Sequence, residues 1–225
     1  MEFSVQTANP AKAETPCLLV PVYKGGDFLP TVAKLDDASE RLIGQLLERG
    51  DFDAALGNVQ LVPFAPGLGA ERILLVGLGE REKCQEAAFI KALDAAMTAL
   101  VKLPIDEASV VFGDVPLTDR DAAWKARKVM EAAERAIYRF DQFKSSPAPA
   151  PSLAKLTLII TDADAVPQVK QGALVGNAIG QGINYTRTLG NLPGNVCTPS
   201  YLAEQAEQLG RDSQGALEVD ILDEE

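Results

Sequence analysis

The sequence predicts an α/β fold with a mixed sheet, and two observations support this. Short apolar runs typical of buried strands alternate along the 225 residues with segments whose apolar residues recur at helical spacing. In two places one strand-like run directly follows another without a helix between them. Such neighbouring strand pairs indicate that the sheet is mixed rather than purely parallel.

The strand predictions rest mainly on apolar runs bounded by turn residues. The run at 17–23 is apolar enough for a strand buried on both faces, although Pro21 predicts a bulge or an edge near its end. The run at 72–77 is apolar apart from its first residue, which indicates a central strand. The predicted strands are 3–6, 17–23, 59–64, 72–77, 109–112, 156–161 and 217–222.

The helix predictions rest on apolar periodicity and on capping residues. Asp37 and Asp119 are expected to cap two helix starts, and Gly50 to end the first helix. Thr198 is expected to cap a later helix with Pro199 at its first position. The predicted helices are 36–50, 83–103, 119–138, 166–189 and one that starts at 198.

Composition excludes several functional classes. The net charge is −11, from 32 acidic and 21 basic residues, and no run of Lys and Arg exceeds two, so binding to a phosphate backbone is disfavoured. The chain has no histidine, which excludes a Ser-His-Asp triad or a His-ligated metal built from this chain alone. Three cysteines at long spacings suit a reducing cytosol. We see no signal peptide and no apolar run near ~20 residues, so we expect a cytoplasmic protein without a membrane span.

One glycine pair lies where phosphate-binding turns occur. Gly77 and Gly79 follow a predicted strand and precede a helix, but Glu82 stands where the dinucleotide motif has its third glycine. The acidic residues after Gly79 would also repel a phosphate. An ordinary strand-to-helix turn is therefore the preferred interpretation.

Other polar groups allow a functional or a structural interpretation. Asp162 and Asp164 could bind a metal, but aspartates are routine at a helix start. The carboxylates at 223–225 fit a solvated acidic end better than a metal site. The helix that carries Trp124 also carries the basic residues Lys125, Arg127 and Lys128. A nucleic-acid surface is conceivable there, but a solvated face with a buried Trp is preferred because acidic residues lie close by.

Longer segments resemble the leucyl (cytosol) aminopeptidase family. The segment 187–203, with Asn191, Pro193, Asn195 and Thr198-Pro199, resembles the junction between the two domains of that family, although Gly194 replaces a usual proline. Segments 71–79 and 138–145 look like two further recurring stretches of the family, and the shorter segments 35–37 and 50–52 also fit. The matches follow the family's order along essentially the whole chain.

The resemblance implies a macro-domain-like amino-terminal α/β domain over 1–164, a connecting helix and loop over 165–195, and the truncated start of the catalytic domain over 196–225. It implies a hexamer that acts on peptides with two divalent metal ions (manganese or zinc), which activate water to attack the first peptide bond. The metal-binding motifs of the family do not occur in this chain. We therefore assign no catalytic, cofactor-binding or metal residue and expect this chain alone to be inactive and to bind no cofactor.

Two alternatives to the peptidase interpretation remain open. The macro-like domain could bind a nucleotide such as ADP-ribose, for which Gly77 and Gly79 offer the nearest phosphate loop. It could instead serve as a DNA-interaction or assembly domain, against which the acidic balance argues.

Overall fold

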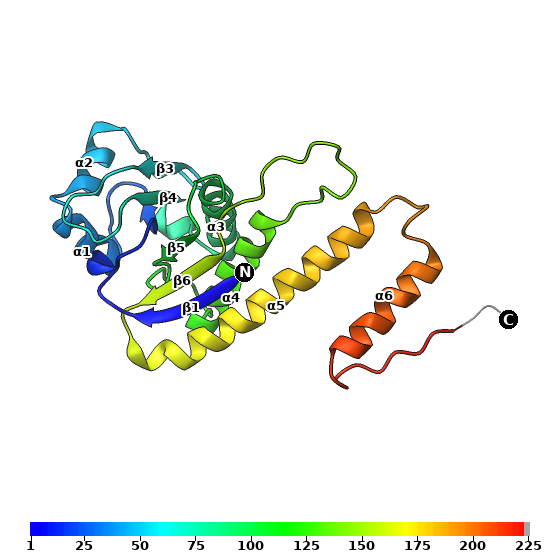
Figure 1. The fold of residues 1–225 in the computed structure, drawn as a ribbon. Helices are drawn as coiled ribbons and strands as arrows, with labels where there is room; N and C mark the ends of the chain where they lie inside the picture. Colours follow the sequence, from blue (N-terminus) through cyan, green and yellow to red (C-terminus); the bar gives the residue numbers. More distant parts are fainter. Residues whose placement is uncertain (223–225) are drawn as a thin grey trace. The chain divides into compact units, whose positions relative to one another are not determined.

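A single six-stranded sheet organises the chain. The computed structural model describes residues 1–222, and its sheet has the order β1-β6-β5-β2-β4-β3 (Figure 1). The α/β class predicted from the sequence is thus confirmed. The strands are β1 (Glu2–Thr7), β2 (Leu18–Tyr23), β3 (Val59–Val62), β4 (Ile73–Gly79), β5 (Glu107–Val110) and β6 (Lys155–Ile160).

The sheet is mixed, as the neighbouring strand pairs predicted. All paired strands are parallel except β3, which runs antiparallel to β4. Every residue of β2 is buried, as expected for a parallel strand covered on both faces. Pro21 is tolerated inside the sheet because β2 pairs with β5 only at Leu18 and Leu19, so the ladder on that side ends before it. The register with β4 then shifts between Val22 and Tyr23, which confirms the predicted bulge.

The strand order contains a switch point between β2 and β5. After β2 the chain adds β3 and β4 on one side of β2, and afterwards β5 and β6 on the other side. At such a switch, the loops that follow neighbouring parallel strands diverge and leave a crevice at the carboxyl edge of the sheet, where ligands of open α/β sheets generally bind. The topology alone therefore marks this edge as a place for a site.

The first helical region differs from the prediction. The single helix expected at 36–50 is two helices, α1 (Pro30–Ala38) and α2 (Leu42–Arg49), separated by Glu40 and Arg41 at positive φ. Asp37 caps neither helix. Asp36 is buried instead, and its carboxylate accepts a hydrogen bond from the Gly44 amide in the first turn of α2 at 2.9 Å. The predicted stop at Gly50 is confirmed, since its φ of 76° is left-handed.

The predicted cap of the fourth helix is wrong by two residues. Asp121, rather than Asp119, caps α4 (Ala122–Ile137) and accepts from the Trp124 amide at 2.8 Å. Asp119 has a φ of 55°, whereas an N-cap residue needs an extended backbone. Preceding α4, α3 (Glu86–Leu100) packs against both α4 and β4.

A buried carboxylate on α4 is neutralised by two cations. Glu131 accepts from Arg127 Nε and Lys128 Nζ, each at 2.7 Å, and its side chain is only 6% exposed. Burial raises the pKa of Glu131, but the hydrogen bonds and charges of Lys128 and Arg127 outweigh burial and hold the pKa below its ordinary value. Glu131 therefore stays ionised in the folded protein.

Replacing Glu131 by Gln is expected to destabilise the fold by about 1–2 kcal/mol at pH 7, because charge-assisted hydrogen bonds become neutral ones. The wild-type advantage is fully present above the ordinary glutamate pKa of 4.5 and is lost as the pH falls through the depressed folded value. Urea unfolding of both proteins at pH 7 and near pH 3 measures this. An equal stability difference at both values would contradict the assignment.

The fifth helix lies close against α4. α5 spans Val166–Asn191, close to the predicted range 166–189. A Cβ atom added at Gly172 would lie 2.1 Å from the Ala123 carbonyl oxygen, and one at Gly176 would lie 2.3 Å from that of Arg127. Only glycine allows the two helix backbones to approach this closely.

The chain forms two compact units, one at 1–183 and one that begins at Asn184. The second unit contains the end of α5 and α6 (Pro199–Asp212), which Thr198 caps through the Tyr201 amide as predicted. Within this unit the Tyr185 hydroxyl donates to Gln205 Oε1 at 3.0 Å. The biological domain boundaries expected at 164 and 195 stay a prediction.

The strand predicted at 217–222 is wrong. These residues have no regular secondary structure and are exposed. Its alternating pattern lacks a neighbouring strand in the described residues, and a strand needs such a neighbour for its backbone hydrogen bonds. Val219 instead lies near Gly210 of α6.

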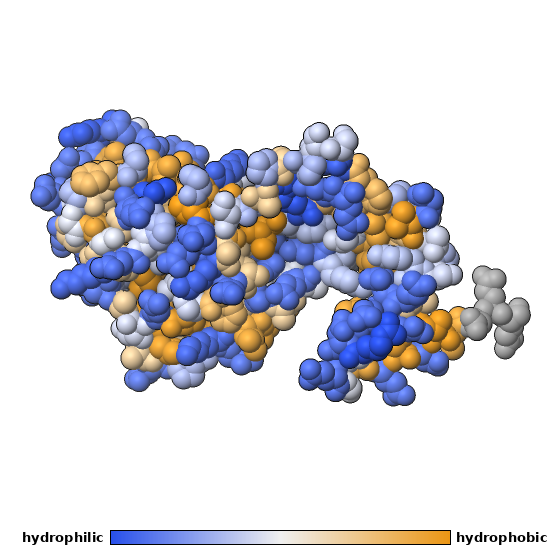
Figure 2. Space-filling model, viewed as in Figure 1, coloured by the Kyte–Doolittle hydropathy of each residue, from blue (hydrophilic) through white to orange (hydrophobic). Residues whose placement is uncertain are grey.

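The core of the first unit lies around the sheet and α3. Phe89 and Cys17 are fully buried, and burial raises the pKa of the Cys17 thiol to about 12. On the face shown in Figure 2, hydrophilic side chains predominate over this unit, with hydrophobic patches between them. In the described part of the chain, no helix has both the length and the apolar character needed to cross a membrane.

Candidate functional site

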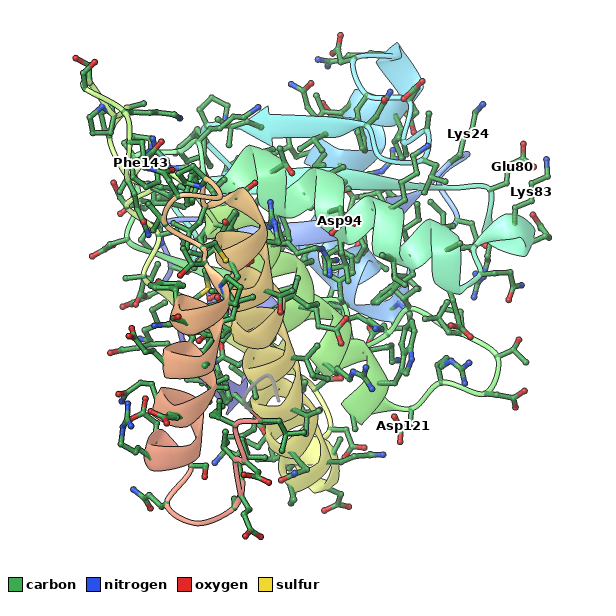
Figure 3. The ribbon with its side chains drawn as sticks, turned by 90° about the vertical axis from the view of Figure 1, so that its right-hand side faces the viewer. Lys24, Glu80, Lys83, Asp94, Asp121 and Phe143 are labelled. Atoms are coloured by element: carbon green, nitrogen blue, oxygen red, sulfur yellow. The ribbon has the colours of Figure 1, made fainter. Side chains whose placement is uncertain are left out.

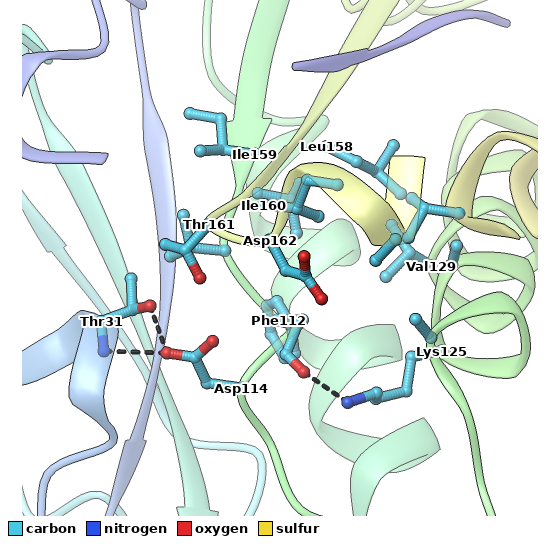
Figure 4. A pocket seen from close by; sticks show the side chains of 17 residues that line it. Thr31, Phe112, Asp114, Lys125, Val129, Leu158, Ile159, Ile160, Thr161 and Asp162 are labelled. Carbon is cyan, nitrogen blue, oxygen red and sulfur yellow. Dashed lines mark hydrogen bonds between the residues drawn. The ribbon is translucent and has the colours of Figure 1, made fainter. Parts of the chain in front are cut away.

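A pocket of about 170 Å³ opens at the carboxyl edge of β5 and β6, beside the switch point (Figure 4). We call it the switch pocket. Its apolar wall comes from the ends of β5 and β6 and from the helices α4 and α5. The wall includes Val110, Phe112, Val129, Leu158, Ile160 and Val169, and the polar lining consists of Thr31, Asp114, Lys125, Thr161 and Asp162.

One side of the pocket is built by a contact across the switch point. The Asp114 carboxylate, in the loop after β5, accepts at Oδ2 from the Thr31 amide at 2.8 Å and from the Thr31 hydroxyl. Thr31 lies in the first turn of α1, where Leu29 provides no side-chain cap. Asp114 thus caps α1 from a distant loop, and its Oδ1 has no hydrogen-bond partner among residues 1–222.

A lysine lies across the pocket from α1. Lys125 Nζ, on the first turn of α4, donates to the Gly113 carbonyl and to the Val115 carbonyl at 3.2 Å. Burial lowers the pKa of Lys125, and the charges of Asp114 and Asp121 oppose this shift without cancelling it. An ammonium has three donors, so one N–H remains for a ligand.

The sequence singled out Asp162 and Asp164, and the structure separates their roles. Asp162 lines the pocket, with its carboxylate directed into it beside Phe112 (Figure 4), while Asp164 does not line it. Asp162 Oδ1 accepts from the Asp164 amide at 3.0 Å and so caps the short 3-10 helix Ala163–Ala165. Within the described residues Asp162 Oδ2 has no protein partner.

The glycine pair lies in the last three residues of β4, at the same edge of the sheet, and its amides are used in backbone hydrogen bonds. The Gly77 amide donates to the Asn58 carbonyl at 2.8 Å, and the Gly79 amide donates to the Ala54 carbonyl at 3.0 Å. Glu80 and Lys83 pair at 2.6 Å in the turn that follows (Figure 3). Neither glycine amide is available to a phosphate, which favours the ordinary-turn interpretation.

The basic residues around Trp124 do not form a common basic surface. Arg127 and Lys128 bind Glu131, and Lys128 also lies 5.7 Å from the centre of the half-buried Trp124 ring. Lys125 instead lines the switch pocket. This favours the interpretation of a charge-balanced helix over that of a nucleic-acid surface.

The residues that the structure describes do not fit a metal site. Over residues 1–222, no group of three or more His, Cys, Asp or Glu side chains is placed to hold a metal ion. The acidic stretch 223–225 considered in the sequence lies outside the described residues. Among residues 1–222, the two divalent ions implied by the resemblance therefore have no such ligand set.

The sequence pattern does not mark three of the pocket residues as site candidates. No motif in it distinguishes Thr31 and Asp114, and the pattern around Lys125 indicates a solvated helix face. The available signal is that Asp114 lies in the loop after a predicted buried strand, because carboxyl ends of parallel strands gather at one edge of the sheet.

The geometry defines an α/β domain with a ligand-sized pocket at its switch point, and comparison with known proteins identifies its family. Residues 19–147 match the N-terminal domain of the cytosol aminopeptidase family. The chain is 66% identical over 225 residues to a probable cytosol aminopeptidase of Chromohalobacter salexigens, covering 100% of this chain and 44% of that protein. It is 38% identical over 224 residues to the cytosol aminopeptidase of Pseudomonas aeruginosa, covering 100% of this chain and 45% of that protein. The chain belongs to the cytosol aminopeptidase family and spans less than half the length of these relatives.

Solved structures support the same fold. A mutant of tomato leucine aminopeptidase superposes with a TM-score of 0.77 at 19% identity, covering 95% of this chain and 43% of that chain. The bottromycin maturation enzyme BotP in complex with Mn gives 0.66 at 23% identity, covering 89% of this chain and 37% of that chain. The family membership predicted from the sequence is confirmed.

Proposed function

We propose that this chain is the amino-terminal portion of a metal-dependent leucyl aminopeptidase that releases N-terminal amino acids from peptides in the cytoplasm. The observation that carries the proposal is the 66% identity over all 225 residues to a protein named as a probable cytosol aminopeptidase. The family match over residues 19–147 supports it independently.

In this proposal the chain contributes architecture rather than catalysis. Residues 1–164 form a macro-like assembly or regulatory domain, 165–195 connect it to the catalytic domain, and 196–225 begin that domain. Both metal ions, manganese or zinc, are bound by residues outside this chain, and the complete protein is a hexamer. The lack of a metal-ligand group over residues 1–222 is consistent with this division.

The test compares two proteins in hydrolysis of leucine p-nitroanilide with added manganese. One is this 225-residue chain, and the other is the chain extended by the downstream sequence of its gene. We expect activity only in the extended protein, because the chain alone lacks the metal-binding motifs of the family. Activity of the short chain would contradict the placement of the catalytic site, and inactivity of both would contradict the peptidase function.

A further inference from the structure

We propose that the switch pocket binds a free α-amino acid with a branched aliphatic side chain. The inference rests on the proposed function for the source of such a ligand, since an aminopeptidase releases free amino acids. The ligand class itself follows from the apolar wall, the two carboxylates and the lysine that line the pocket.

The volume and the wall suit one short aliphatic chain. A dry cavity of about 150 Å³ lined by aliphatic and aromatic side chains is known to hold benzene, and the switch pocket measures about 170 Å³. Val110, Phe112 and Val129 in its wall are each only 2% exposed, so their positions are fixed by the core. A branched side chain such as that of leucine would occupy the space beside this apolar wall and displace water from its surface.

The two carboxylates suit an ammonium group. Asp162 directs its carboxylate into the pocket, and Asp114 lines the same pocket with an Oδ1 that accepts no hydrogen bond from the described residues (Figure 4). Thr31 and the Asp164 amide hold the other oxygen of each carboxylate. The two carboxylates are therefore oriented before a ligand arrives, which reduces the entropy that binding must overcome.

The lysine suits a carboxylate group. Two carbonyls fix Lys125 Nζ and leave one donor. An anionic ligand would accept from the remaining donor of this partly desolvated ammonium. Two carboxylates and one ammonium line a pocket that also has an apolar wall, which complements the zwitterion and side chain of an α-amino acid. A simple amine or a simple carboxylic acid would pair with only one kind of charge.

Isothermal titration of the 225-residue chain tests this binding without any peptidase activity. We expect L-leucine to bind saturably with a dissociation constant of about 1 mM or below. Leucine lacking its carboxylate (3-methylbutylamine) and leucine lacking its ammonium (4-methylpentanoate) should each bind about tenfold or more weakly, because each loses one charge-assisted contact. No saturable heat with L-leucine would overturn the proposal.

Two variants test which side chains contact the ammonium and the carboxylate of the ligand. Asp162→Asn keeps an acceptor for the Asp164 amide but loses the charge, and should weaken L-leucine about tenfold without weakening 4-methylpentanoate. Lys125→Met should weaken L-leucine and leave 3-methylbutylamine unchanged. The matched controls Asp164→Asn and Lys170→Met alter charges that do not line the pocket, so L-leucine should bind them as it binds the wild type.

Three results contradict the proposal. If Asp162→Asn and Asp164→Asn weaken L-leucine binding equally, Asp162 does not contact the ligand ammonium. If Lys125→Met binds L-leucine as the wild type does and has a wild-type circular dichroism spectrum, Lys125 does not contact the ligand carboxylate. Saturable binding of ADP-ribose in place of L-leucine would instead make the pocket a nucleotide site. These measurements detect binding and not hydrolysis. A negative binding result would therefore not contradict the proposed aminopeptidase function, which the hydrolysis assay tests separately.

Discussion

Replacing Gly176 by alanine is expected to lower the free energy of unfolding by about 1–3 kcal/mol, and Gly172→Ala should do the same. The added Cβ at Gly176 would lie 2.3 Å from the Arg127 carbonyl oxygen and 2.8 Å from the Arg127 Cα. At Gly172 it would lie 2.1 Å from the Ala123 carbonyl oxygen. These neighbours are helix backbone, so they cannot rotate away as a side chain would, and α5 must move off α4.

Thermal unfolding measures the effect, since 1 kcal/mol corresponds to about 2–4 °C in Tm for a domain of this size. Gly182→Ala is the matched control on the same helix, because an added Cβ there meets nothing within 4 Å. Removing glycine from a helix interior should stabilise that variant by up to about 1 kcal/mol. Equal Tm values for Gly176→Ala and Gly182→Ala would contradict the close contact between α4 and α5.

Truncation of Phe89 to alanine should lower the free energy of unfolding by about 3–5 kcal/mol. Phe89 is fully buried on α3. Its ring lies 5.7 Å from that of Phe112 in an edge-on arrangement and 5.9 Å from that of Trp124. The substitution therefore removes the contact among α3, the segment that follows β5, and α4. This contact supports one wall of the switch pocket, which Phe112 lines.

Urea unfolding at pH 7 tests this, with two comparisons. Phe89→Leu keeps most of the buried volume and should lose less than the alanine variant. Phe143→Ala makes the same chemical change at a side chain that is 59% exposed (Figure 3), and should leave the stability nearly unchanged. Similar losses for Phe89→Ala and Phe143→Ala would show that Phe89 is not part of the core described.

The parts of the fold that depend on local pattern could be predicted from the sequence. The apolar run of β2 identifies a strand buried on both faces, and the Thr198-Pro199 pair identifies the start of α6 through capping chemistry alone. The beginning of α5 at Val166 follows from the end of the preceding strand. In each case the cause lies within a few residues of the element.

The predictions that were wrong or incomplete concern residues whose partners lie far away in the sequence. The α1 helix begins at Pro30 with help from Asp114, a contact across 83 positions that no local pattern contains. The stretch at 217–222 alternates like a strand, yet a strand needs a neighbour to pair with. Lys125 looks like any solvated helix lysine until β5 and its loop are placed beside it.

Metal content gives the most direct test of the division between this chain and the residues that follow it in the proposed enzyme. The 225-residue chain and the extended protein are incubated with manganese, freed of unbound metal and measured by plasma mass spectrometry. The proposed division predicts two manganese ions per extended subunit and none retained by the short chain. Stoichiometric manganese on the short chain would contradict this division and place a metal site within residues 1–225.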